Sequence, residues 1–140
     1  MRWIGALEKS LSALPAGQQK LLMAEAGRSC AGEILALSEK SLGREIVSIE
    51  DLIEGWNMLR SRRNLYGGWV RAGNTVKGLF TECGCPLVRS GLVQLQPARC
   101  FCSQNMMETI FSKIARKEVV VEIRQAIGRG DAVCEFHVTY

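Results

Sequence analysis

Apolar residues recur every three to four positions through the first 66 residues, which is the spacing of one face of an α-helix. The pattern predicts a helix over residues 3–14, ended by Pro15, and a second helical stretch over residues 18–41. Two glycines within residues 27–32 predict a corner in the second stretch, because each costs about 1 kcal/mol relative to alanine in a helix interior. A third helix is predicted to start at residues 48–51, a Ser-x-x-Asp sequence similar to a capping box.

From Trp69 onward the period of the pattern shortens toward the alternation that is typical of β-strands. Residues 69–82 predict two short strands joined by a turn. Residues 118–127 and 132–140 predict two more, joined by the turn Gly128-Arg-Gly-Asp131. In the last strand, alternate side chains are expected to face the core.

Between these two strand pairs, the pattern predicts a helix over residues 104–117, capped by Ser103 and carrying one apolar stripe. Leu87-Val88 and Leu92-Val93 are expected to add short strands, with loops at the neighbouring prolines.

The length of 140 residues matches one domain, since a domain usually holds roughly 100–200 residues. We therefore expect a single α+β domain over residues 1–140. Residues 1–66 form its helical half, and residues 67–140 form a half in which an antiparallel sheet packs with helices. An apolar content of 47% and a charged content of 23% are typical of a folded globular chain. The net charge of +4 is too small to indicate a nucleic-acid partner by itself.

Neither a signal-peptide core nor a membrane-spanning run is visible in the sequence, so we expect a cytoplasmic protein with no membrane partner. In that reducing compartment, six cysteines are more naturally free thiols or metal ligands than disulfides.

Two Cys-x-Cys pairs, Cys83/Cys85 and Cys100/Cys102, hold most of the cysteine in the chain. Four thiolates form a zinc ligand set, and Gly84 allows the irregular backbone that convergence of the sulfurs requires. The residues leave three alternatives open: a metal site, free or redox-active thiols lining a pocket or the core, and disulfides. Zinc is the expected metal, ahead of an iron–sulfur cluster.

The two remaining cysteines are expected to bind ligand rather than to be principal metal ligands. Cys134 alternates with apolar residues of the last strand and is expected to face the core. Cys30 would face the same pocket if the N-terminal helices fold over the sheet. His137 alternates away from Cys134, so the two are not expected to share a metal.

Charged residues give weaker signals. Glu82 and Glu108 are candidate pocket carboxylates, although neither has a partner at a spacing that demands acid–base chemistry, and we assign no catalytic residue. Five cations form a candidate basic patch that is more simply read as a solvated helix end; they are Arg60, Arg62, Arg63, Arg71 and Lys77.

The C-terminal half resembles the 4-vinyl reductase domain superfamily and its relatives, the L-2-amino-thiazoline-4-carboxylic acid hydrolase-like proteins, and more distantly the heme NO-binding and TRAPP-subunit fold. The residues that carry the resemblance are Val119-Val-Val-Glu-Ile123, the turn Gly128-Arg-Gly-Asp131, and Cys134-Glu-Phe136. Cys83-Gly-Cys-Pro86, with the second Cys-x-Cys pair, resembles a cysteine-rich bacterial branch. Many relatives carry another cysteine just before the turn, where this chain has Gln125-Ala-Ile127.

The resemblance implies an α/β sandwich with a pocket between sheet and helices, and a ligand-sensing or metal-assisted role. Together with the cysteines it predicts a small-molecule-binding or sensing protein whose cysteine cluster binds zinc or acts as a redox-sensitive thiol site. The alternative is a thiol-dependent or metal-assisted hydrolase, and a nucleic-acid-associated regulator is a weaker alternative. We expect a small molecule as the partner, rather than a membrane or a nucleic acid, and the sequence leaves a homodimer open.

Overall fold

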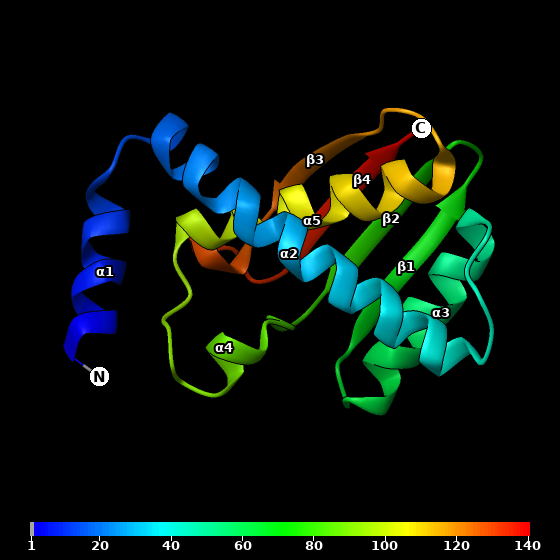
Figure 1. Cartoon of the computed structure of the whole chain (residues 1–140), viewed down its shortest axis with the longest axis horizontal. Helices are drawn as coiled ribbons and strands as arrows, with labels where there is room; N and C mark the ends of the chain where they lie inside the picture. Colours follow the sequence, from blue (N-terminus) through cyan, green and yellow to red (C-terminus); the bar gives the residue numbers. More distant parts are fainter. Residues whose placement is uncertain (1) are drawn as a thin grey trace.

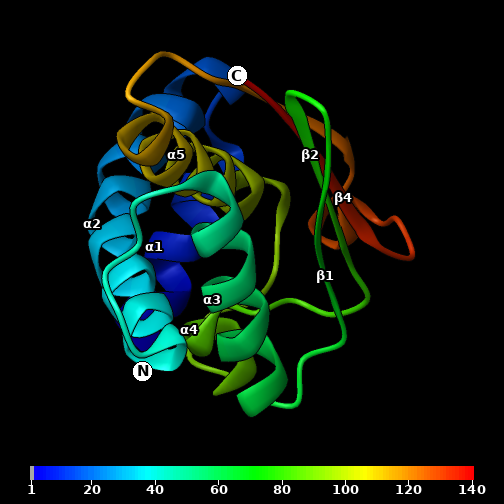
Figure 2. The same cartoon turned by 90° about the vertical axis from the view of Figure 1, so that its right-hand side faces the viewer.

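The structure is a computed structural model that describes residues 2–140, and its elements form two layers. Figure 2 shows the helices on one side and the four-stranded antiparallel sheet on the other. Helices α2 (Ala16–Leu42) and α5 (Pro97–Ala115) pack against each other over the sheet, while α1 (Arg2–Ala13) stands at one end of the molecule (Figure 1). The predicted α+β class is confirmed.

The connection between α2 and α3 (Ile49–Arg62) is fixed by local hydrogen bonds at both ends. Gly43 ends α2 with a left-handed φ of 84° and donates its N–H to the carbonyl of Glu39 at 2.8 Å. Ser48 caps α3, because its Oγ accepts the N–H of Asp51 at 3.1 Å. The helix start predicted at residues 48–51 is therefore confirmed.

The corner predicted within residues 27–32 is wrong, because α2 is one continuous helix of 27 residues. Gly27 lies where α2 crosses α5. A Cβ atom on Gly27 would stand 2.6 Å from the carbonyl oxygen of Cys102 and 2.7 Å from the Cβ of Asn105. The glycine thus allows the two helices to approach closely, and this packing outweighs its unfavourable helix propensity.

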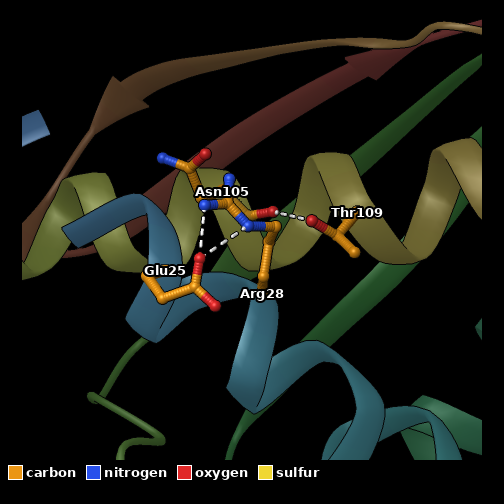
Figure 3. Close-up of polar contacts among 4 residues, drawn as sticks. All are labelled: Glu25, Arg28, Asn105 and Thr109. Carbon is orange, nitrogen blue, oxygen red and sulfur yellow. Dashed lines mark hydrogen bonds and ion pairs between the residues drawn. The ribbon is translucent and has the colours of Figure 1, made fainter. Parts of the chain in front are cut away.

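Polar side chains flank this crossing, as Figure 3 shows. On α2, Nη2 of Arg28 lies 2.6 Å from Oε2 of Glu25. On α5, the hydroxyl of Thr109 donates to the carbonyl of Asn105 at 2.8 Å. Each of these contacts stays within its own helix, so the distance between the helices is set by the packing at Gly27.

The sheet has the strand order β1-β2-β4-β3, with every neighbouring pair antiparallel. Its strands are β1 (Gly67–Ala72), β2 (Thr75–Phe80), β3 (Val120–Gln125) and β4 (Cys134–Thr139). All four predicted strands are present. The turn after β3 contains a short 3-10 helix, η1 (Ile127–Arg129).

The core between the sheet and the helices is built around Trp69. Its ring centroid lies 5.1 Å from that of Trp56, 5.2 Å from that of Phe80 and 5.2 Å from that of Phe111. The side chain of Asn57 donates to the carbonyl of Trp69 at 2.9 Å and accepts its N–H at 2.8 Å. Asn57 therefore ties α3 to the edge strand β1.

Residues 86–103 differ most from the prediction. The expected short strands at Leu87-Val88 and Leu92-Val93 are wrong, because residues 86–89 form helix α4 (Pro86–Arg89) and residues 92–93 lie in a loop. Helix α5 starts at Pro97 rather than after a cap at Ser103. Proline suits the first turn of a helix, where its missing N–H has no intrahelical partner. Both prolines therefore begin helices instead of marking loops.

Candidate functional site

A cavity of about 230 Å³ lies between helices α2, α3 and α5, the ends of strands β2 and β4, and the segment that follows β2. Its apolar lining includes Ile34, Leu37, Trp56, Leu59, Leu65, Phe80, Met106, Met107 and Phe136. The six cysteines of the chain all line this same cavity, as free thiols. A second, more open hollow lies beside α1 and is lined by no cysteine.

The cysteines that line the cavity come from four separate parts of the chain. Cys30 lies on α2 and is exposed, Cys134 begins β4, and Cys100 and Cys102 lie on α5. Cys83 and Cys85 belong to the segment after β2. The structure therefore brings the predicted ligand-binding residues Cys30 and Cys134 to the same cavity as the two Cys-x-Cys pairs.

Within the cavity the thiols interact beyond the two sequence pairs. Burial raises the pKa of Cys102 to about 11, with further increases from Cys30 and Cys85. Burial also raises the pKa values of Cys83 and Cys100, with further increases from Cys85 and Cys134 for Cys83 and from Cys134 and Cys83 for Cys100. Cys30 and Cys102 thus interact from different helices, while Cys83 interacts with Cys85, Cys100 and Cys134.

The helical conformation of residues 100–102 separates the thiols of the second pair. Residues two apart on an α-helix point about 200° apart around its axis, because each residue advances about 100°. Cys100 and Cys102 therefore cannot both point at one ion bound to Cys83 and Cys85 while α5 keeps its first turns. Within residues 2–140, no three His, Cys, Asp or Glu side chains are gathered to hold a metal ion.

The raised pKa values make these thiols weak nucleophiles near neutral pH. Cys30, Cys83, Cys100 and Cys102 all have pKa values above the ordinary value, with burial as the main cause in each. The nucleophile of a thiol-dependent enzyme has the opposite property, because a lowered pKa exposes the reactive thiolate. These four thiols therefore present neutral, soft, weakly polar sulfur to the cavity.

Arg60 is a site residue that sequence reasoning assigned to a solvated helix end. It is 8% exposed and lines the cavity from the last turn of α3. Its guanidinium carbon lies 4.1 Å from the ring centroid of Phe80, and its Nη2 donates to the carbonyl of Tyr66 at 3.0 Å. Its position was a usable signal, because it stands four residues after the buried Trp56 on the apolar face of α3.

Of the other cations of the predicted basic patch, Arg63 also lines the cavity, whereas Arg71 and Lys77 lie elsewhere. Arg71 forms an ion pair with Glu50, and Lys77 lies 3.6 Å from Glu135. The patch proposed as a nucleic-acid alternative is thus divided between the cavity, the start of α3 and strand β2.

The remaining titratable residues singled out in the sequence have separate places. Glu82 lines the cavity, and its Oε1 accepts the N–H of Tyr66 at 3.2 Å. Glu108 is on α5 outside the cavity lining, and burial raises the pKa of its carboxyl group. His137 lies on the other face of the sheet from Cys134, as predicted, with its Nε2 2.9 Å from Oε2 of Glu135.

Comparison with known proteins gives structural neighbours but no family. No protein-family model matches the sequence, and no curated protein matches it. The phenol-responsive sensory domain of the transcription activator PoxR, solved with phenol, shares the fold with a TM-score of 0.51 and 12% identity, over 89% of this chain and 71% of that chain.

A trafficking protein particle complex subunit 3 from Naegleria fowleri, covalently bound to palmitic acid, matches with a TM-score of 0.54 and 16% identity, over 99% of this chain and 90% of that chain. At these identities the similarity shows the fold alone. It agrees with the distant resemblance to the TRAPP-subunit fold, while membership of the 4-vinyl reductase superfamily stays a prediction. Among the helices of residues 2–140, none is both long and apolar enough to cross a membrane.

Proposed function

We propose that this chain is a small-molecule-binding domain of the sensory kind, which holds its ligand in the thiol-lined cavity. The observation that carries the proposal is the convergence of all six cysteines and a set of apolar side chains on one cavity of about 230 Å³. Ligand sites are typically concave and mostly apolar, with a small number of polar groups that orient the ligand. An apolar cavity of about 150 Å³ holds benzene, so this cavity has room for one or two rings or a short acyl chain.

The neighbours of similar fold support the proposal by analogy. One was solved with phenol and the other with covalently bound palmitic acid, both of them molecules with an apolar body. The free thiols suit such a ligand because a buried cysteine behaves as a small hydrophobe with a weak donor.

A cavity-filling variant tests this proposal. Ala26 lines the cavity from α2, and Ala36 is an exposed residue of the same helix outside the lining. Phenol and indole should bind the wild-type protein in a titration followed by NMR, and Ala26→Phe should abolish binding while Ala36→Phe leaves it unchanged. Equal binding to the wild type and Ala26→Phe would place the ligand elsewhere and contradict the proposal.

A redox role for the thiols is a second candidate, favoured by the interaction between Cys30 and Cys102. The two thiols lie on different helices, and each shifts the pKa of the other. Oxidation would join the two sulfurs as they lose two protons and two electrons. Oxidised glutathione would accept both and be reduced to two thiols. Such a bond would cross-link α2 to α5 at the edge of the cavity.

Zinc at Cys83, Cys85, Cys100 and Cys102 stays a prediction, and the four thiols do not fit one tetrahedral ion in this arrangement. Binding all four would require the first turns of α5 to unwind, since Cys100 and Cys102 point to different sides of that helix. The hydrolase alternative has less support, because the raised pKa values are the reverse of those of an activated nucleophile.

A further inference from the structure

Arg60 places a buried positive charge in the wall of the cavity. The residue is 8% exposed, and its Nε atom is buried without a hydrogen-bond partner. Burial is the main cause that lowers the pKa of the guanidinium group, which nevertheless stays protonated in proteins. A buried cation with an unsatisfied donor is unfavourable unless another molecule supplies an acceptor. The guanidinium group of Arg60 therefore still needs a hydrogen-bond acceptor.

The protein itself supplies no full counter-charge to Arg60 within residues 2–140. Glu82 is the acid with the strongest effect on Arg60, but the two form no ion pair, and Glu82 accepts the N–H of Tyr66. Burial raises the pKa of Cys83, so this neighbouring thiol is not an anion near neutral pH. The carboxylate near Arg99, another arginine of the lining, is Glu8, which forms an ion pair with it.

The surroundings hold the guanidinium group in place and leave room beside it. Its Nη2 donates to the carbonyl of Tyr66, and its plane is supported by the ring of Phe80. A Cβ atom on Gly84 would lie 3.2 Å from Nη1, closer than an ordinary contact. The glycine therefore keeps a side chain away from the nitrogen atom that faces the segment after β2.

From these observations, and resting on the proposed function, we infer that the ligand is a small organic carboxylate. Its apolar body fills the space among the thiols and rings, and its carboxylate group pairs with Arg60. A guanidinium group matches a planar carboxylate with two parallel hydrogen bonds, so Arg60 selects the anion over a neutral molecule of the same shape.

Matched pairs of acid and amide test this inference. Phenylacetate and phenylacetamide, and indole-3-acetate and indole-3-acetamide, have similar shapes and differ mainly in charge. In titrations with the wild-type protein, each acid should bind about tenfold or more tightly than its amide. Arg60→Met should remove that preference while amide binding persists. Arg62→Met, at an exposed position two residues further along α3, should keep the preference for the acid.

Two more variants keep the test decisive if Arg60→Met does not fold. Arg60→Lys retains the positive charge without the planar fork and should keep part of the preference. Gly84→Ala places a methyl group against Nη1 of Arg60 and should weaken the binding of the acid more than that of the amide.

The outcomes separate this inference from the proposed function. Acid and amide binding with equal affinity, unchanged by substitution of Arg60, would overturn the carboxylate inference and leave the cavity as a ligand site. Equal weakening of acid and amide by Gly84→Ala would also overturn it. Failure of all four compounds to bind the folded wild-type protein would overturn both.

Discussion

The thiols of Cys30 on α2 and Cys102 on α5 interact across the helix crossing, although 71 other residues of the chain separate them. Burial is the main cause that raises the pKa of Cys102 to about 11, and each of the two thiols also alters the pKa of the other. This relationship is invisible in the Cys-x-Cys pattern, which pairs Cys102 with Cys100. It makes Cys30 and Cys102 the thiols whose oxidation would couple two helices.

Oxidation should therefore produce a specific disulfide. Treatment with oxidised glutathione should join Cys30 to Cys102, as detected by peptide mapping of the alkylated protein. Because the reactive species is the thiolate and both pKa values are raised, the rate should rise about tenfold for each unit from pH 7 to pH 9.

Two serine variants complete that experiment. Cys30→Ser should prevent the disulfide, whereas Cys134→Ser, at the start of β4, should leave it intact. A mixture of bonds between unrelated cysteines, or a rate that does not change with pH, would argue against a specific pair.

Gly27 should be intolerant of any side chain. Gly27→Ala places a methyl group 2.6 Å from the carbonyl oxygen of Cys102, and we expect it to lower the free energy of unfolding by about 1–3 kcal/mol. Gly32→Ala, in the same helix with open space around it, should raise that free energy by about 0.5–1 kcal/mol. Chemical denaturation measures both, and a stabilising Gly27→Ala would show that the helices do not meet at this glycine.

Asn57 should contribute strongly to stability although it is a polar residue of a helix surface. Asn57→Ala removes the acceptor of the Trp69 N–H and the donor to its carbonyl, and leaves buried backbone groups unsatisfied. We expect a loss of about 1–3 kcal/mol in the free energy of unfolding. Glu54→Ala, at an exposed position of the same helix, is the control and should change it little. Equal losses from the two variants would show that the hydrogen bonds of the Asn57 side chain do not stabilise the fold.

Acid should weaken the connection between α2 and α3 through Asp51. The hydrogen bond from Arg44 is the main cause that holds the pKa of this carboxyl group below its ordinary value, and the N–H of Val47 adds to it. A lowered pKa in the folded state stabilises the fold above the unfolded-state pKa, and this stabilisation is lost as the pH falls through the folded-state value.

Thermal unfolding measured from about pH 6 to about pH 2.5 tests this assignment. Asp51→Asn should unfold at a lower temperature than the wild type near pH 6, and the difference should shrink as the pH falls below about 4. A difference that stays constant over the whole range would show that the Asp51 charge is not the cause.

The strand half of the fold was readable from the sequence, because alternation and turn residues are local signals. Cys134 and Phe136 face inward as predicted, and His137 faces the other side. The start of α5 was not readable in the same way, since Pro97 is equally consistent with a loop and with the first turn of a helix.

The candidate site was predicted in its residues but not in its arrangement. All six cysteines line one cavity, yet the interaction of Cys30 with Cys102 depends on the crossing of α2 and α5, where Gly27 allows close approach. Arg60 was misassigned because an arginine near a helix end is usually solvated, and its burial depends on the segment that folds back after β2. The arrangement of the cysteines and the burial of Arg60 therefore depend on packing between distant segments, which local sequence patterns do not reveal.

The methionine methyl groups report directly on whether a small molecule occupies the thiol-lined cavity. Met106 and Met107 line the cavity, whereas Met23 and Met58 lie outside its lining. In a methyl NMR spectrum of protein labelled with ¹³C-methionine, phenylacetate should shift the signals of Met106 and Met107 in a saturable manner and leave those of Met23 and Met58 in place. Saturable shifts confined to Met23 or Met58, or no shifts at all, would contradict the account.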